Sequence, residues 1–79
     1  MKLRLKLFAA FRRYLPPGTQ GNACDVEVPG GTQVSDLLSQ FSMPENESLI
    51  ILVNGRDAGP DRVLQDGDVV AAFPTMAGG

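Results

Sequence analysis

The 79-residue sequence contains no histidine and a single cysteine, Cys24. Histidine is the side chain that general acid–base catalysis uses most often, so its absence argues against an enzyme that works by proton transfer. One cysteine allows no disulfide within the chain, and without histidine it supplies too few ligands for a zinc site. We therefore expect no catalytic residue, no metal and no cofactor, and we interpret Cys24 as a structural side chain.

Long apolar runs and a surplus of basic residues are also missing. No run approaches the ~20 apolar residues that span a bilayer, and positions 1–8 alternate basic and apolar residues that a signal peptide would separate. The net charge is −2 and the pI is near 4.8, whereas nucleic-acid-binding proteins usually carry a basic surface. We interpret the basic residues among the first 13 as a solvated face. The sequence predicts a cytoplasmic protein that binds neither membrane nor nucleic acid.

Alternating hydrophobicity predicts two strands in the first third of the chain. Residues 2–8 place leucines on one face and basic side chains on the other, which is the period of a half-buried strand. Residues 9–23 are expected as a loop, with apolar anchors from Phe11 to Leu15, because prolines and glycines interrupt the rest. Residues 24–28 alternate again, and we expect them to form a hairpin with the first strand.

One amphipathic helix is predicted at about 33–42. Its apolar residues follow helical spacing and share one stripe, namely Val34, Leu37, Leu38 and Phe41. Thr32 stands at the expected N-cap, and Asp36 lies near the positive end of the helix dipole. Pro44 is expected to close the helix, before a polar link at 45–48.

The second half of the chain predicts three more strands. Residues 49–53 form the most continuous apolar run, as in a well-buried strand. The Asn54-Gly55 pair is a tight-turn signal, after which residues 56–58 can return as an edge strand. The last strand is predicted at 69–73, and Pro74 should stop it because proline cannot donate to a sheet ladder.

A loop precedes the last strand. Residues 59–65 are expected as a loop or a single helical turn, with Val63 and Leu64 pointing inward. A turn at 66–68 then leads into the strand.

This order of elements leaves one helix to cover one face of a mixed sheet. The first and last strands would lie parallel in the middle, since so small a chain needs both to build one core. The prediction is an α+β protein of the β-grasp, or ubiquitin-like, class with four to five strands. We expect one domain at 1–74, followed by a flexible tail at 75–79.

The chain stops at Gly78-Gly79, and a carboxylate on two glycines can enter a slot that a Cβ would block. The last fourteen residues resemble the C-terminal segment of the MoaD/ThiS family of ubiquitin-like sulfur carriers. The shared pattern is a Gly-Asp turn, an apolar strand ending in Phe73-Pro74, and a short tail to Gly-Gly. The Val53-Asn54-Gly55 turn and the opening strand with Phe8 and residues 11–15 also resemble this family. The resemblance is weak from 16 to 48.

The resemblance implies a carrier that is not itself catalytic. A ubiquitin-activating-type adenylyltransferase (MoeB/ThiF-like) would adenylate the Gly79 carboxylate, and a sulfur donor would convert it to a thiocarboxylate. A MoaE-like large subunit of molybdopterin synthase would then receive the sulfur for a molybdopterin precursor.

The residues next to the two glycines suit such a carrier. Thr75, Met76 and Ala77 are uncharged, and the five-residue tail spans ~17 Å when extended. Pro74 restricts the backbone at the base of the tail.

Alternation in the last strand also predicts a docking surface. If Val70 and Ala72 face the helix, then Val69, Ala71 and Phe73 face the open side of the sheet, bordered by Lys2, Arg4 and Lys6. Phe73, with Pro74, is then a partner contact. The alternative is that the 9–15 loop partly covers Phe73.

Two other functions stay open. The same chemistry could serve another acceptor, such as thiazole or a modified tRNA base. The chain could instead be a protein modifier joined through Gly79 to lysines of target proteins, because both chemistries begin with the same adenylate.

Overall fold

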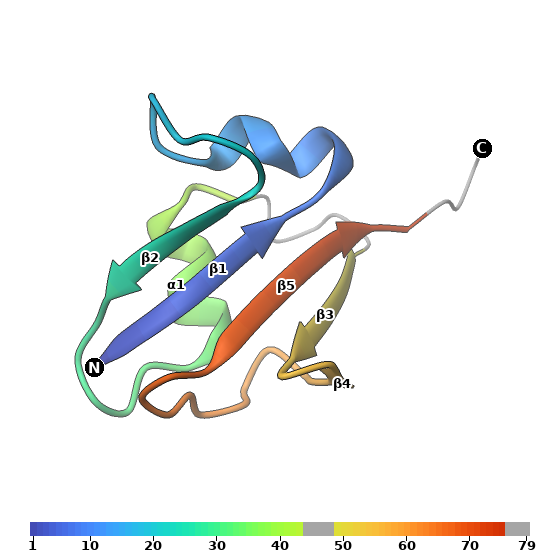
Figure 1. Cartoon of the computed structure of the whole chain (residues 1–79). Coiled ribbons are helices and arrows are strands. Elements are labelled where there is room, and N and C mark those ends of the chain that lie inside the picture. Colours follow the sequence, from blue (N-terminus) through green and yellow to red (C-terminus); the bar gives the residue numbers. More distant parts are fainter. Residues whose placement is uncertain (44–48, 76–79) are drawn as a thin grey trace.

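The computed structural model of the chain describes residues 1–43 and 49–75, and the structural statements below concern these residues. The predicted helix stop at Pro44, the link at 45–48 and the tail beyond Thr75 lie outside them. Five strands, one α-helix and one 3₁₀-helix are described (Figure 1). In chain order they are β1 (Lys2–Leu7), η1 (Ala9–Tyr14), β2 (Ala23–Glu27), α1 (Val34–Gln40), β3 (Leu49–Val53), β4 (Arg56–Asp57) and β5 (Val69–Pro74).

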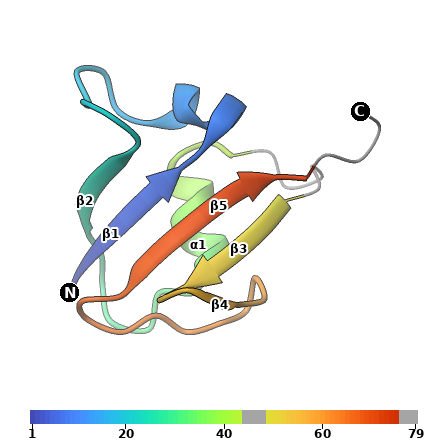
Figure 2. The same ribbon diagram turned by 45° about the vertical axis from the view of Figure 1, so that its right-hand side comes forward.

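The strands form one mixed sheet in the order β2-β1-β5-β3-β4 (Figures 1 and 2). The two central strands, β1 and β5, are parallel, with Arg4 opposite Val69 and Leu7 opposite Ala72. The other pairs are antiparallel, including the predicted hairpin of β1 and β2. This arrangement confirms the predicted β-grasp fold with the first and last strands in the middle.

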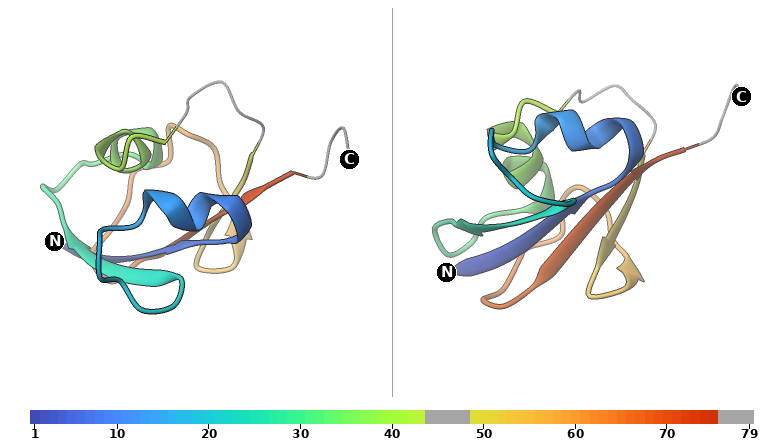
Figure 3. Two further views of the ribbon diagram at one scale, coloured as in Figure 1. Left: turned by 90° about the horizontal axis from the view of Figure 1, so that it is seen from above. Right: turned by 45° about the horizontal axis from the view of Figure 1, so that its top comes forward.

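Helix α1 covers one face of the sheet and leaves the other open (Figure 3). The leucines of β1 and the residues Val70 and Ala72 of β5 point toward α1 and are buried. From α1, Val34, Leu37 and Leu38 complete this core, while Phe41 is half-buried at its edge. Period two in β1 and β5 and period 3.6 in α1 therefore assigned the buried faces correctly.

The start of α1 differs from the prediction. Thr32 is not the N-cap, because its hydroxyl donates to the carbonyl oxygen of Pro29 (2.8 Å) and the helix begins two residues later, at Val34. Gln33 holds the cap position, and its backbone N–H donates to the carboxylate of Asp36 (3.0 Å). Asp36 thus lies in the first turn, as expected, where a negative charge favours the helix dipole.

The predicted loop at 9–23 contains η1, which the sequence did not indicate. Phe11 on this helix is buried and closes the end of the core, as expected of an anchor. The backbone reaches η1 through Ala9 in the left-handed region (φ 53°), which is uncommon for a residue other than glycine. The N–H of Phe8 donates to the carbonyl oxygen of Ala72 (3.2 Å), so the start of η1 is fixed to β5.

Two apolar residues expected inside are exposed. Strand β3 is less buried than its continuous apolar run predicts, since the side chain of Ile50 is 44% exposed on the open face. Val63 is 49% exposed although its neighbour Leu64 is buried, as predicted. Successive residues of an extended segment point in opposite directions, so Val63 and Leu64 cannot both face the core.

The tight turn after β3 and the edge strand β4 are confirmed. Asn54 and Gly55 both have positive φ (54° and 84°), as a two-residue hairpin turn requires. Arg56 and Asp57 then pair with the end of β3.

Candidate functional site

The base of the tail lies on β5, between two neighbouring strands. Pro74 does not stop the strand: β5 includes it, opposite Leu49 of β3. A strand tolerates proline at an edge or at its end, because the N–H that proline lacks is not needed there for a hydrogen bond within the sheet. Thr75, the last described residue, is half-buried. The predicted tail residues Met76, Ala77, Gly78 and Gly79 lie outside the described residues.

The ring of Phe73 stacks on the ring of Phe8, just before the tail. The ring centroids are 4.3 Å apart and the planes differ by 4°. Both residues are half-buried, so Phe73 is not freely exposed, and the ring on which it stacks belongs to the residue just before η1. The stacked pair joins the ends of β1 and β5 on the open face of the sheet.

A stripe of apolar side chains continues from this pair across the open face. Val69 and Ala71 of β5 are half-buried there, as predicted. On the neighbouring strand Ile50 lies opposite Phe73, and Leu52 lies opposite Ala71. Directly opposite residues share one face of a sheet. We call these six residues the apolar stripe: Phe8, Ile50, Leu52, Val69, Ala71 and Phe73.

Three members of the apolar stripe were missed by the sequence reasoning. For Phe8 a signal existed, because strict alternation places it on the same face as Lys6. Ile50 and Leu52 gave no signal, since they lie within a continuous apolar run that does not distinguish its two faces.

Basic side chains border the apolar stripe along β1, as predicted. The side chain of Arg4 pairs with Asp25 of β2, with 3.1 Å between Nε and Oδ1. Both side chains are largely solvent-exposed, so this ion pair contributes little to stability. Lys2 lies opposite Glu27 in the same register, whereas Lys6 lies opposite Ala23.

The described residues provide no constellation for catalysis or metal binding. Within 1–43 and 49–75 no group of three histidine, cysteine, aspartate or glutamate side chains could hold a metal ion. The thiol of Cys24 is half-buried on β2, and burial, followed by the charge of Asp25, raises its pKa. A thiol with a raised pKa is a poor nucleophile at neutral pH. Over the same ranges, no helix is long and apolar enough to cross a membrane.

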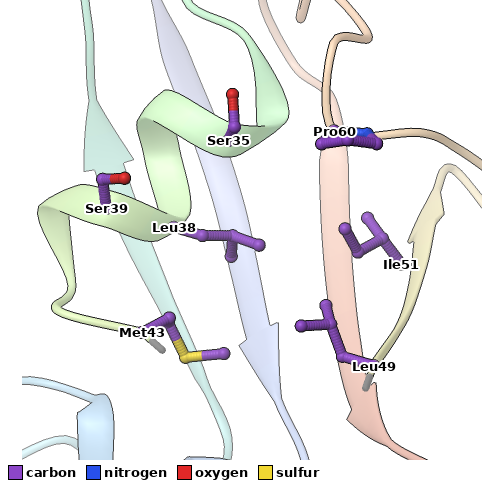
Figure 4. A pocket seen from close by; sticks show the side chains of 7 residues that line it. All are labelled: Ser35, Leu38, Ser39, Met43, Leu49, Ile51 and Pro60. Atoms are coloured by element: carbon purple, nitrogen blue, oxygen red, sulfur yellow. The ribbon is translucent and has the colours of Figure 1, made fainter. Parts of the chain in front are cut away.

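A cavity of about 240 Å³ lies on the opposite side of the sheet from the apolar stripe, between α1 and β3. Leu38 and Met43 line one wall, and Leu49 and Ile51 line the other (Figure 4). The remaining lining residues are Ser35, Ser39 and Pro60. Because none of these side chains titrates near neutral pH, the cavity can accommodate apolar groups but supplies no acid or base.

A family model described as the ThiS family matches residues 5–79 of the chain. A search of the curated proteins finds no match. Among solved structures, a Pyrococcus furiosus protein described as a "putative molybdopterin converting factor, subunit 1" is similar, with 32% identity and a TM-score of 0.73. The match covers 95% of this chain and 98% of that one.

Two more distant structures share the fold. The small archaeal modifier protein 1 of Haloferax volcanii is 22% identical, with a TM-score of 0.76 over 95% of this chain and 98% of its own. The second is a chain from the complex of subunits 1 and 2 of the Helicobacter pylori molybdopterin-converting factor. It is 18% identical, with a TM-score of 0.63, and the match covers 100% of both chains.

Proposed function

The chain belongs to the ThiS family of ubiquitin-like proteins, and from this premise we propose that it is a sulfur carrier activated at Gly79. The acceptor that we favour is a molybdopterin precursor, with the chain acting as the small, MoaD-like subunit of a synthase. The observation that carries this choice is the 32% identity, over nearly the full length of both chains, to the Pyrococcus furiosus protein.

The proposed chemistry takes place at the C-terminal carboxylate. An oxygen of the Gly79 carboxylate attacks the α-phosphate of ATP in a MoeB/ThiF-like adenylyltransferase, and pyrophosphate leaves. The terminal sulfur of a persulfide donor then attacks the carbonyl carbon and displaces AMP. A thiol cleaves the resulting S–S bond, which leaves a thiocarboxylate on Gly79 and a disulfide on the donor side. A MoaE-like large subunit would receive the carrier and its sulfur.

The described residues support a role in presenting the tail. Strand β5 is bonded on both sides, so the point where the tail begins is fixed relative to the domain. The apolar stripe ends at the stacked pair of Phe8 and Phe73, and Phe73 is followed directly by Pro74 and Thr75 at the base of the tail. We propose that partner enzymes dock on this stripe, with Val69, Ala71, Phe73 and Pro74 in the contact, while Thr75, Met76, Ala77 and Gly78 lead Gly79 into the active site.

Intact-mass measurement of the protein purified from its own cells tests the proposal. We expect a fraction of the chain to carry an exchange of one oxygen for sulfur, localised to Gly79 by fragmentation. Co-purification with a large synthase subunit would support the molybdopterin precursor as the acceptor. Conjugates to lysines of other proteins through Gly79, with no thiocarboxylate, would instead identify a protein modifier. A thiocarboxylate without that subunit would point to another acceptor, such as thiazole or a tRNA base.

A further inference from the structure

The basic side chains of the chain are concentrated in its first 13 residues. Residues 1–13 carry five of the seven basic side chains and no acidic one. Two acidic side chains with described contacts, those of Asp66 and Asp68, lie at the beginning of β1 and β5. The Asp66 carboxylate accepts from the backbone N–H of Lys2 (2.7 Å), and Asp68 immediately precedes β5. Both of these carboxylates therefore lie at the end of β1 and β5 away from Pro74.

Some of the basic side chains are balanced within the sheet. Arg4 pairs with Asp25, and Lys2 lies opposite Glu27, so β2 places a carboxylate beside each. Lys6, farther along β1, has Ala23 on one side and Ala71 on the other. In the described part of the chain, the one ion pair within 4.0 Å is that of Arg4 with Asp25. Lys6 therefore has no acidic residue directly opposite it in either adjoining strand.

Two guanidinium groups follow on η1, at the end of the sheet to which β1 and β5 point (Figures 1 and 3). Arg12 and Arg13 are exposed, and both line a hollow of about 370 Å³ between η1 and the loop before β2. The side chain of Arg13 is partly fixed, because its Nε donates to the carbonyl oxygen of Ala10 (3.2 Å) and its guanidinium lies 5.7 Å from the centre of the Tyr14 ring.

Backbone hydrogen bonds link the walls of the hollow to the strand that carries Lys6 and to the stacked aromatic pair. The loop that forms one wall is bonded to β1, since the N–H of Leu7 donates to the carbonyl oxygen of Asn22 (2.9 Å). On the other side of the hollow, just before η1, the backbone N–H of Phe8 donates to the carbonyl oxygen of Ala72 on β5. We call Lys6, Arg12 and Arg13 the basic end. It adjoins the apolar stripe at the same end of the domain from which the tail leaves.

We propose that the basic end is an electrostatic docking surface for an acidic loop of the activating enzyme, with one of its carboxylates seated in the hollow between Arg12 and Arg13. This inference rests on the proposed function, because it names the chemistry of the partner that takes the tail. Two guanidinium groups around one concavity suit a carboxylate, which can accept several N–H bonds. Basic side chains at the end of the domain from which the tail leaves attract such a partner toward that end, and this steering raises the rate of association.

A pair of matched double variants tests the proposal. R12E/R13E reverses two charges at the basic end, and R56E/R62E reverses two exposed charges elsewhere, so both alter the net charge equally. The probe is the purified adenylyltransferase encoded in the same genome, with ATP present. Stopped-flow association rates are measured from low to high NaCl, together with the rate of pyrophosphate release at saturating carrier.

We expect R12E/R13E to lower the association rate at low salt by about tenfold or more, and to flatten its dependence on salt. Pyrophosphate release at saturation should change little, because Gly79 is untouched. The charge-neutral R12Q/R13Q variant should give an intermediate rate, which guards against a folding defect in the reversed one. R56E/R62E should keep the wild-type rate and salt dependence.

Equal rates and salt slopes for the two double reversals would overturn the docking inference while leaving the carrier function intact, provided that wild-type chain is adenylated. If the enzyme does not adenylate the wild-type chain at all, the proposed function fails and this inference fails with it. An equal loss in both double variants would show that net charge alone governs the encounter, which also overturns it.

Discussion

Asp68 is the residue on which the turn into β5 depends. It is buried, and its carboxylate accepts from the side-chain amide of Asn54 (2.8 Å) and from the backbone N–H of Gln65 (2.8 Å). Asn54 in turn accepts from the N–H of Val69 and donates its own N–H to the carbonyl oxygen of Val69. One carboxylate thus joins the turn after β3 to the beginning of the strand that carries the tail.

Replacing Asp68 with alanine should lower the free energy of unfolding by about 1–3 kcal/mol, because two donors lose their acceptor in a buried site. Replacing Asp68 with asparagine should not restore the stability, since the side-chain NH₂ of asparagine would face an N–H donor at one of the two contacts. Urea denaturation of both variants checks this, with Asp57→Ala on the exposed strand β4 as the control. A loss for Asp68→Ala no larger than for the control would contradict the role assigned to the turn.

Cys24 should react slowly with thiol reagents in the folded protein. Burial, followed by the charge of Asp25, raises the pKa of its thiol, so less of the reactive thiolate is present at any given pH. Labelling by an aromatic disulfide reagent should therefore reach half its maximal rate at a higher pH in buffer than in urea, where the chain is unfolded. A folded-state midpoint below the unfolded one would reverse the sign of the expected shift and contradict the prediction.

At the scale of elements, η1 and β5 each contribute a phenylalanine at the same end of the domain, but the two side chains are buried to different extents. Phe11 of η1 is buried, with 2% of its surface exposed, whereas Phe73 of β5 is half-buried on the open face. The two phenylalanines allow a contribution to folding to be separated from a contribution to docking.

Phe11→Ala should cost about 3–5 kcal/mol of stability, as expected for the loss of a buried ring. In a domain of this size, which buries only ~60% of its unfolded surface, such a loss threatens folding itself. Thermal and urea unfolding measure it. A small loss would mean that η1 does not close the core as its burial indicates.

Phe73→Ala should leave the fold intact and weaken activation. The ring is half-buried and its stacking on Phe8 adds about 0.5–1.5 kcal/mol, so the stability loss should be smaller than for Phe11. Adenylation kinetics with the activating enzyme should show a higher KM for the variant. Val63→Ala, which truncates an exposed apolar residue outside the apolar stripe, is the control. Unchanged adenylation kinetics for Phe73→Ala would rule out the docking role.

Sequence patterns predicted these elements unequally. Strands β1 and β5 alternate cleanly, so their buried and open faces could be assigned residue by residue. The two faces of strand β3 could not be assigned, because the open face of the sheet carries apolar residues as well. A sequence pattern predicts burial for an apolar residue such as Ile50 whichever face it lies on. Helix η1 gave no periodic signal, being only six residues long and entered through a left-handed alanine. The stacking of Phe8 on Phe73 depends on the parallel pairing of distant segments, which no local pattern encodes.

At the scale of the whole molecule, the tail follows a strand that is paired on both sides. Strand β5 is central and pairs with both β1 and β3, so its end cannot separate from the sheet without breaking two ladders. The pairing of β1 with β5 also brings the first and last segments of the chain together. The stable part of the molecule and its proposed reactive end are therefore directly continuous, with Thr75 as the first residue beyond the sheet.

Deleting Gly79 should abolish thiocarboxylate formation without altering the stability of the domain. The shortened tail would still end in a glycine carboxylate, but the attacking carboxylate oxygen would lie about 3.5 Å short of its position beside the α-phosphate, a displacement large enough to prevent in-line attack. Pyrophosphate release with the activating enzyme measures the first effect and urea denaturation the second. Gly79→Val tests the slot separately: it restores the length but adds a branched side chain at the tip, and should also be inactive if the channel admits only glycine. A shortened chain that still formed the adenylate and accepted sulfur would mean that Gly79 is not the activated residue, and the proposed carrier mechanism would have to be abandoned.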